Sequence, residues 1–189
     1  FVLAFLTHNL RLSMLPLIIM LILNFYAHTF KKQFFVGNFM IALSTAFVVL
    51  LPTLFEIGGK GEDSDMQLEI QSGIAIAGIV YGIFAFFSTF LRELVKDMED
   101  VSGDRHGNCK TIPIVLGIKG AKGIAFFIVI LLSIQLALFV WFFPSIQIKY
   151  VAYIIVLGLL LPLLLIAVLI AISNTAKQFY YTSNLIKLF

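Results

Sequence analysis

Charged residues are scarce in this chain. Asp, Glu, Lys and Arg together make up 12% of its 189 residues, whereas 61% are hydrophobic. The mean hydropathy is +1.06. A soluble domain of this length would need far more polar side chains to cover its surface. The composition therefore excludes a soluble globular protein and favours a protein that lies in a lipid bilayer.

Cysteine is also nearly absent. The single Cys109 excludes an internal disulfide. It lies in a charged stretch, which is typical of the reducing cytoplasmic side of a membrane. The formal net charge is only +3, and we expect no nucleic-acid partner.

Long apolar runs predict helices that cross the membrane, each of which needs about 20 residues. The expected spans are residues 12–30, 36–55, 70–91, 124–143 and 148–172. The sequence thus predicts an all-α, polytopic transmembrane helix bundle with about five complete spans. Because the chain opens inside an apolar run and ends in a segment that becomes apolar again, we expect residues 1–189 to be a single membrane domain within a larger one.

The positive charges are unevenly shared between the expected loops. Ten of the 13 Lys and Arg residues fall on one side, and three fall on the other. The three are Arg11, Lys60 and Lys149. By the positive-inside rule, the side with ten is cytoplasmic, and the acidic loop expected at residues 56–69 is external.

Most of the remaining charge gathers in residues 92–117, which read RELVKDMEDVSGDRHGNCKTIPIVLG. Glu93, Asp97, Asp100 and Asp104 follow a spacing of i, i+4, i+7 and i+11. On one helix this spacing places all four carboxylates in a narrow stripe. Their mutual repulsion calls for a neutralising partner, and a hard divalent cation such as Mg²⁺, bound together with a diphosphate, suits oxygen ligands beside basic residues.

Three other interpretations of this stretch are open on spacing alone. A mixed-charge segment between membrane helices is often a solvated face with no further role. Carboxylates can mark the ion path of a transporter or channel, although all ten acids here lie in expected loops or helix ends. A CDP-alcohol phosphotransferase would also bind a metal, but its DG-x-x-AR stretch is missing from the sequence.

The string DMEDVSGDRHGNCKTIPIVLG resembles the second aspartate-rich motif of the UbiA family of intramembrane prenyltransferases. The matching positions are Asp97, Asp100, Gly103, Asp104, Arg105, Gly107, Thr111, Pro113 and Gly117. A tyrosine and a lysine near the end of the first expected span, followed by Gly37-Asn38, also resemble the family.

The resemblance implies a prenyltransferase that moves a polyprenyl group from an isoprenoid diphosphate donor to a hydrophobic acceptor. That acceptor would be lipid-like or, as the second choice, aromatic. It also implies Mg²⁺ as the cofactor, an active site on the cytoplasmic side, and a place in the cell's inner (plasma) membrane. The implied catalytic and metal-binding residues are Asp97, Asp100 and Asp104, and the implied substrate-binding residues are Tyr26, Lys31, Arg105 and Lys110. The family's first motif, of the N-D-x-x-D type, does not occur in the sequence, and we expect it upstream of Phe1.

Overall fold

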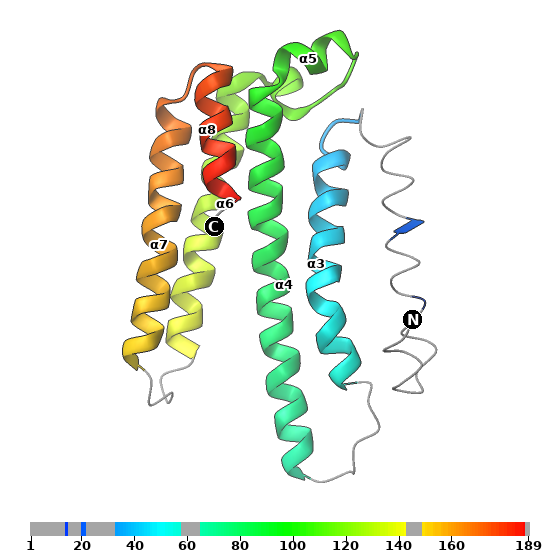
Figure 1. Cartoon of the computed structure of the whole chain (residues 1–189), viewed down its shortest axis with the longest axis vertical. Coiled ribbons are helices and arrows are strands. Elements are labelled where there is room, and N and C mark those ends of the chain that lie inside the picture. Colours follow the sequence, from blue (N-terminus) through cyan, green and yellow to red (C-terminus); the bar gives the residue numbers. More distant parts are fainter. Residues whose placement is uncertain (1–13, 15–19, 22–32, 58–64, 143–148, 188–189) are drawn as a thin grey trace.

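The computed structural model describes residues 14, 20–21, 33–57, 65–142 and 149–187. Within these ranges every regular element is a helix (Figure 1). The helices are α3 (Val36–Ile57), α4 (Asp65–Glu99), α5 (Val101–His106), α6 (Ile112–Phe142), α7 (Lys149–Ile172) and α8 (Ala176–Ile186). The all-α fold expected from the sequence is thereby confirmed.

The long helices run side by side along the longest axis of the molecule (Figure 1). Helix α4 packs against α3, α6 and α8, and α7 packs against α6 and α8. The short helix α5 lies at one end of the bundle, where α4 ends and α6 begins. We call this end, which carries residues 92–117, the motif end.

Three of the helices are long and apolar enough to cross a membrane. They are Val36–Ile57, the Leu68–Glu99 part of α4, and the Ile112–Phe139 part of α6. They correspond to the second, third and fourth expected spans. The fifth expected span forms α7, with a shorter apolar stretch at Leu157–Ile172. Apart from Met14, Met20 and Leu21, the first expected span lies outside the described residues.

Helix α4 is much longer than the expected span at residues 70–91. It starts at Asp65, inside the stretch expected to be an external loop, and continues to Glu99, inside the charged motif. Hydropathy marks only the part of a helix that lies in hydrocarbon, whereas the backbone can stay helical through the polar interface. The expected loop at residues 56–69 is therefore too long at both ends, since α3 also continues to Ile57.

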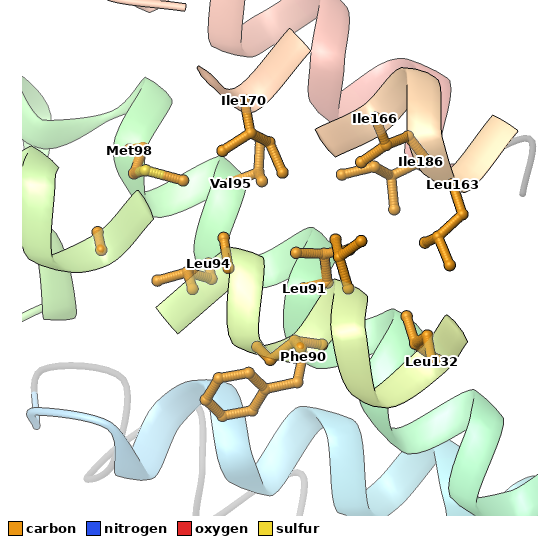
Figure 2. Packing of buried hydrophobic residues seen from close by; sticks show 14 of the residues in the cluster. Phe90, Leu91, Leu94, Val95, Met98, Leu132, Leu163, Ile166, Ile170 and Ile186 are labelled. Atoms are coloured by element: carbon orange, nitrogen blue, oxygen red, sulfur yellow. The ribbon is translucent and has the colours of Figure 1, made fainter. Parts of the chain in front are cut away.

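The buried core lies between α4, α6, α7 and α8. Figure 2 shows Leu91 and Leu94 of α4, Leu132 of α6, and Leu163 and Ile166 of α7 in this core. All five are completely buried. This core fixes the second half of α4, and with it the position of the motif that follows.

Candidate functional site

Helix α4 ends one residue before Asp100, and α5 begins one residue after it. Asp100 has φ −104° and ψ 27° and is exposed. Its N–H still donates to the carbonyl of Lys96 at 3.1 Å, and its own carbonyl accepts from the N–H of Asp104 at 2.9 Å. The expectation of four carboxylates along one helix is therefore wrong at Asp100: Glu93 and Asp97 belong to α4, Asp100 is the joint, and Asp104 belongs to α5.

The side chain of Asp100 occupies space that a side chain at position 103 would need. A Cβ added to Gly103 would meet Oδ1 of Asp100 and would come within 3.0 Å of its Cγ. The glycine of the motif thus allows the Asp100 carboxylate to lie over the first turn of α5. This contact gives a physical reason for the D-x-x-G spacing.

Asp97 is the carboxylate that faces helix α3. Its Oδ2 accepts a hydrogen bond of 2.8 Å from Nδ2 of Asn38, in the first turn of α3. Both side chains are half-buried. Glu93 and Asp104 lie close enough to repel the Asp97 carboxylate, and Lys96 attracts it. The Asp97 carboxylate therefore lies within the electrostatic influence of two other carboxylates of the motif, Glu93 and Asp104.

Glu93 lies deeper in the bundle than the aspartates and is only 8% exposed. Its Oε1 is 3.5 Å from the nearest guanidinium nitrogen of Arg92. The Nε of Arg92 is buried and has no hydrogen-bond partner in the part of the chain that the structure describes. The RE pair at the start of the motif is thus an ion pair between a partly exposed Arg92 and a buried Glu93.

Arg105 lies on another side of the motif, toward α8. It lines a cavity of about 430 Å³ together with Glu99, Asn174 and Phe179. Glu99 also accepts a 3.0 Å hydrogen bond from the hydroxyl of Ser183 in α8. The structure thus groups Arg105 with Glu99 and α8, apart from the contact between Asp97 and α3.

The remaining predicted site residues are Lys110, Tyr26 and Lys31. Lys110 is exposed between α5 and α6. Tyr26 and Lys31 lie outside the described residues, so their predicted role stays a prediction.

A cluster of aromatic rings lies at the interface of α3 and α4 near the motif end. The ring centroids of Phe35 and Phe90 are 5.2 Å apart, and those of Phe39 and Phe86 are 5.4 Å apart. Phe90 precedes Asp97 by seven residues, which places both on the same face of α4, two turns apart. The rings of Phe86 and Phe90 therefore lie farther from the motif end than the carboxylate, within the stretch Leu68–Glu99 that can cross a membrane.

Two apolar clefts follow farther from the motif end. One has a volume of about 610 Å³, and its lining includes Thr45, Tyr81, Ser88 and Gln135. The other, of about 640 Å³, lies between α4 and α6 and is almost entirely apolar. Gln135 lines both clefts and donates from Nε2 to the carbonyl of Val80 at 2.6 Å. Both clefts have room for hydrocarbon.

The donor set at the motif end consists of carboxylate oxygens, which are ligands for hard cations. The described residues contain no group of three or more His, Cys, Asp or Glu side chains placed to hold a metal ion. A closed protein cage is therefore not formed by these residues. Mg²⁺ usually binds through one or two carboxylates and the phosphates of a substrate, and Asp97 with Asp104 fits that partial arrangement.

The helices and the site together define an integral membrane protein that carries a group of charged residues at the motif end of its apolar helices. Comparison with known proteins identifies the class more closely. The model of the UbiA prenyltransferase family matches residues 1–185, and the chain belongs to this family.

Several similar curated proteins are named digeranylgeranylglyceryl phosphate synthase. The one from Methanosphaera stadtmanae is 29% identical over 81% of this chain and 49% of its own length. The one from Saccharolobus solfataricus is 33% identical over 67% of this chain and 40% of its own length. The one from Sulfolobus acidocaldarius is 30% identical over 96% of this chain and 59% of its own length. The chain thus spans about half the length of these relatives, and no solved structure matches it significantly.

Two contacts at the site were not predicted from the sequence. Asn38 was noted only as part of the Gly37-Asn38 resemblance, and Glu99 was given no role. Asn38 lies near the start of the second expected span, at the end where the motif is also expected, and that position is the signal that it lies near the motif. Nothing in the local sequence indicates that Ser183 meets Glu99, because the two residues are 84 positions apart.

Proposed function

We propose that the protein is a Mg²⁺-dependent prenyltransferase that moves a polyprenyl group from an isoprenoid diphosphate to a lipid-like acceptor within the membrane. The observation that carries this proposal is the half-buried Asp97 at the motif end of an apolar bundle, where Glu93 and Asp104 act on its carboxylate electrostatically. Family membership supports the reaction class. In this proposal residues 1–189 form a single membrane domain that is part of a larger one.

Asp97, Asp100 and Asp104 would hold the metal, and the electrostatic interaction between Asp97 and Asp104 supports their acting together. Mg²⁺ would neutralise the diphosphate and stabilise the negative charge that grows on the departing pyrophosphate. We further propose that Tyr26, Lys31, Arg105 and Lys110 contact the diphosphate. Arg105 would have to turn away from the cavity that it shares with Glu99 to do so.

The protein's other contribution is to exclude water from the reacting carbon. Cleavage of the carbon–oxygen bond leaves an allylic cation, which water would capture. Phe35, Phe39, Phe86 and Phe90 form a cluster of packed aromatic rings near the motif end. These rings offer no nucleophile, and their electron-rich faces attract positive charge. The clefts beyond them would accept the hydrocarbon chain.

The names of the relatives support a lipid-like acceptor that carries a glyceryl phosphate group. An aromatic acceptor remains the second choice. The ten-to-three distribution of Lys and Arg supports an active site on the cytoplasmic side of the plasma membrane. No observation favours a transporter or channel, since the described acids lie at or near helix ends rather than midway along a span.

The test is prenyl transfer by the full-length protein, measured with a radiolabelled isoprenoid diphosphate and a Mg²⁺ titration. Asp97→Asn should lower turnover by roughly 10²-fold or more, because it removes a charge that holds the metal against the leaving group. Glu56→Gln is the matched control, since Glu56 is exposed at the opposite end of α3. Equal effects of the two substitutions would refute the proposal.

A further inference from the structure

We propose that Asn38 is a positioning residue that orients the Asp97 carboxylate for metal binding. The inference rests on the proposed function and deepens it. It starts from the 2.8 Å hydrogen bond that Nδ2 of Asn38 donates to Oδ2 of Asp97 across the interface of α3 and α4.

The contact differs from those of other polar side chains on α3. The hydroxyls of Ser44 and Thr45 donate to carbonyls of their own helix, at Met40 and Ile41. Such bonds satisfy a polar group in an apolar environment without involving a neighbour. Asn38 instead donates to Asp97 of α4, which is 59 positions away in the sequence.

The start of α3 is held in a fixed position, which restricts the position of the Asn38 amide. Phe35 has a φ of 63°, which turns the chain immediately before the helix. Its ring packs against Phe90 of α4 at 5.2 Å. The amide and the carboxylate therefore project from two helices that are fixed against each other beside the site.

The chemistry of the amide suits this role. Asn38 donates one hydrogen bond to Oδ2, which leaves Oδ1 of Asp97 with its lone pairs for a cation. Glu93 and Asp104 repel the Asp97 carboxylate, and a neutral donor offsets part of that repulsion. A lysine in the same place would also hold Asp97, but its charge would oppose a metal ion. An apolar residue would let the carboxylate rotate, because χ2 of Asp is broad.

The expected size of the effect follows from groups that orient metal ligands in other proteins. Loss of such a partner commonly lowers metal affinity by about 10–100-fold. Asn38→Leu keeps a similar volume and removes the donor. Asn38→Ala removes the donor with no added bulk and serves as the second variant if the leucine does not fit between the helices. Ser44→Ala is the matched control, because Ser44 is buried on the same helix and bonds only within it.

The experiment measures Mn²⁺ binding to the full-length protein by electron paramagnetic resonance, with inorganic pyrophosphate present and no turnover. The Mn²⁺ midpoint should rise about 10–100-fold in Asn38→Leu and Asn38→Ala, and it should stay unchanged in Ser44→Ala. In an Asp97→Asn background, Asn38→Leu should have no further effect, because Asn38 acts through Asp97.

Two results would overturn the inference. The first leaves the proposed function intact, and the second refutes the proposed function as well. If Asp97→Asn weakens Mn²⁺ binding but both Asn38 variants bind like the wild type, Asn38 does not position the ligand and the proposed function stands. If Asp97→Asn itself binds Mn²⁺ like the wild type, the metal-binding role of Asp97 falls, and the proposed function falls with it.

Discussion

Gly78 of α4 lies directly against α3. Among the described glycines of α4, it is the one at which an added Cβ would come closest to the neighbouring helix. A Cβ at this position would be 2.6 Å from Cγ2 and 2.9 Å from Cβ of Thr53, and it would also meet Oγ1. Separations under 3.0 Å are essentially never tolerated by a real Cβ. A different rotamer of Thr53 can move Cγ2 and Oγ1 but not Cβ. Gly78→Ala therefore forces the two helices apart.

The cost of this separation can be bounded from the structure. Overpacking of a tight interface typically destabilises a protein by about 1–3 kcal/mol. We expect Gly78→Ala to fall in that range, because the helices are also close one turn along, where a Cβ added to Gly82 would come within 3.1 Å of Cγ of Leu50. Gly73 on the same helix has no atom within 4 Å of its Cβ position. Gly73→Ala should therefore have no effect or raise stability by up to about 1 kcal/mol through helix propensity.

The assay is reversible unfolding of the purified protein in mixed micelles, with the free energy of unfolding obtained from a titration with sodium dodecyl sulfate. Thr53→Ala combined with Gly78→Ala should recover only part of the loss, because Cβ of residue 53 would stay at 2.9 Å. Equal stabilities of Gly73→Ala and Gly78→Ala would refute the reasoning. Since Gly78 lies about 28 Å along α4 from Asp97, the Mn²⁺ midpoint should not change.

Three further predictions concern the motif end. Gly117 has φ 73° and ψ 167° inside α6, a conformation essentially confined to glycine, so Gly117→Ala should lower the free energy of unfolding by about 1–3 kcal/mol in the same titration. Ser183→Ala should lower the free energy of unfolding by about 1 kcal/mol in the same titration, because half-buried Glu99 loses its 3.0 Å hydrogen bond. Lys177→Ala, on the exposed face of α8, is the control and should leave the free energy of unfolding unchanged. In intact cells, a membrane-impermeant thiol reagent should leave Cys109 unlabelled but should label a thiol moved to position 64; the reverse pattern would contradict the cytoplasmic assignment.

Hydropathy predicted the spans that became α3, α4 and α6, because burial in hydrocarbon requires a long apolar run. It could not predict that α4 continues to Glu99, since the helical backbone does not stop where the hydrocarbon ends. Helical spacing placed Asp97 and Asp104 near each other but missed the joint at Asp100. The joint depends on a contact between the Asp100 side chain and the space at Gly103, which no periodicity shows.

The sequence also could not predict which residues of other helices contact the motif. The motif alone does not show which side of the helix end faces α3 and which faces α8. Asp97 faces Asn38 of α3, whereas Arg105 faces the cavity beside α8. The place of Arg105 in the motif favoured a position beside the aspartates. Only the packing of α8 against α4 shows that Arg105 also lines a cavity next to α8.

The end of α4 is held from two sides by neutral hydrogen-bond donors. Asp97 and Glu99 are two residues apart, so their side chains point about 200° away from each other around the helix. Asn38 of α3 binds the first, and Ser183 of α8 binds the second. Amide and hydroxyl donors fix the direction of a carboxylate but leave its charge in place, whereas Glu93, deeper in the bundle, is paired with Arg92. The Asp97 and Glu99 carboxylates are therefore each held in a fixed direction by a neutral donor, and for Asp97 this is the geometry that the proposed binding of a cation together with a diphosphate requires.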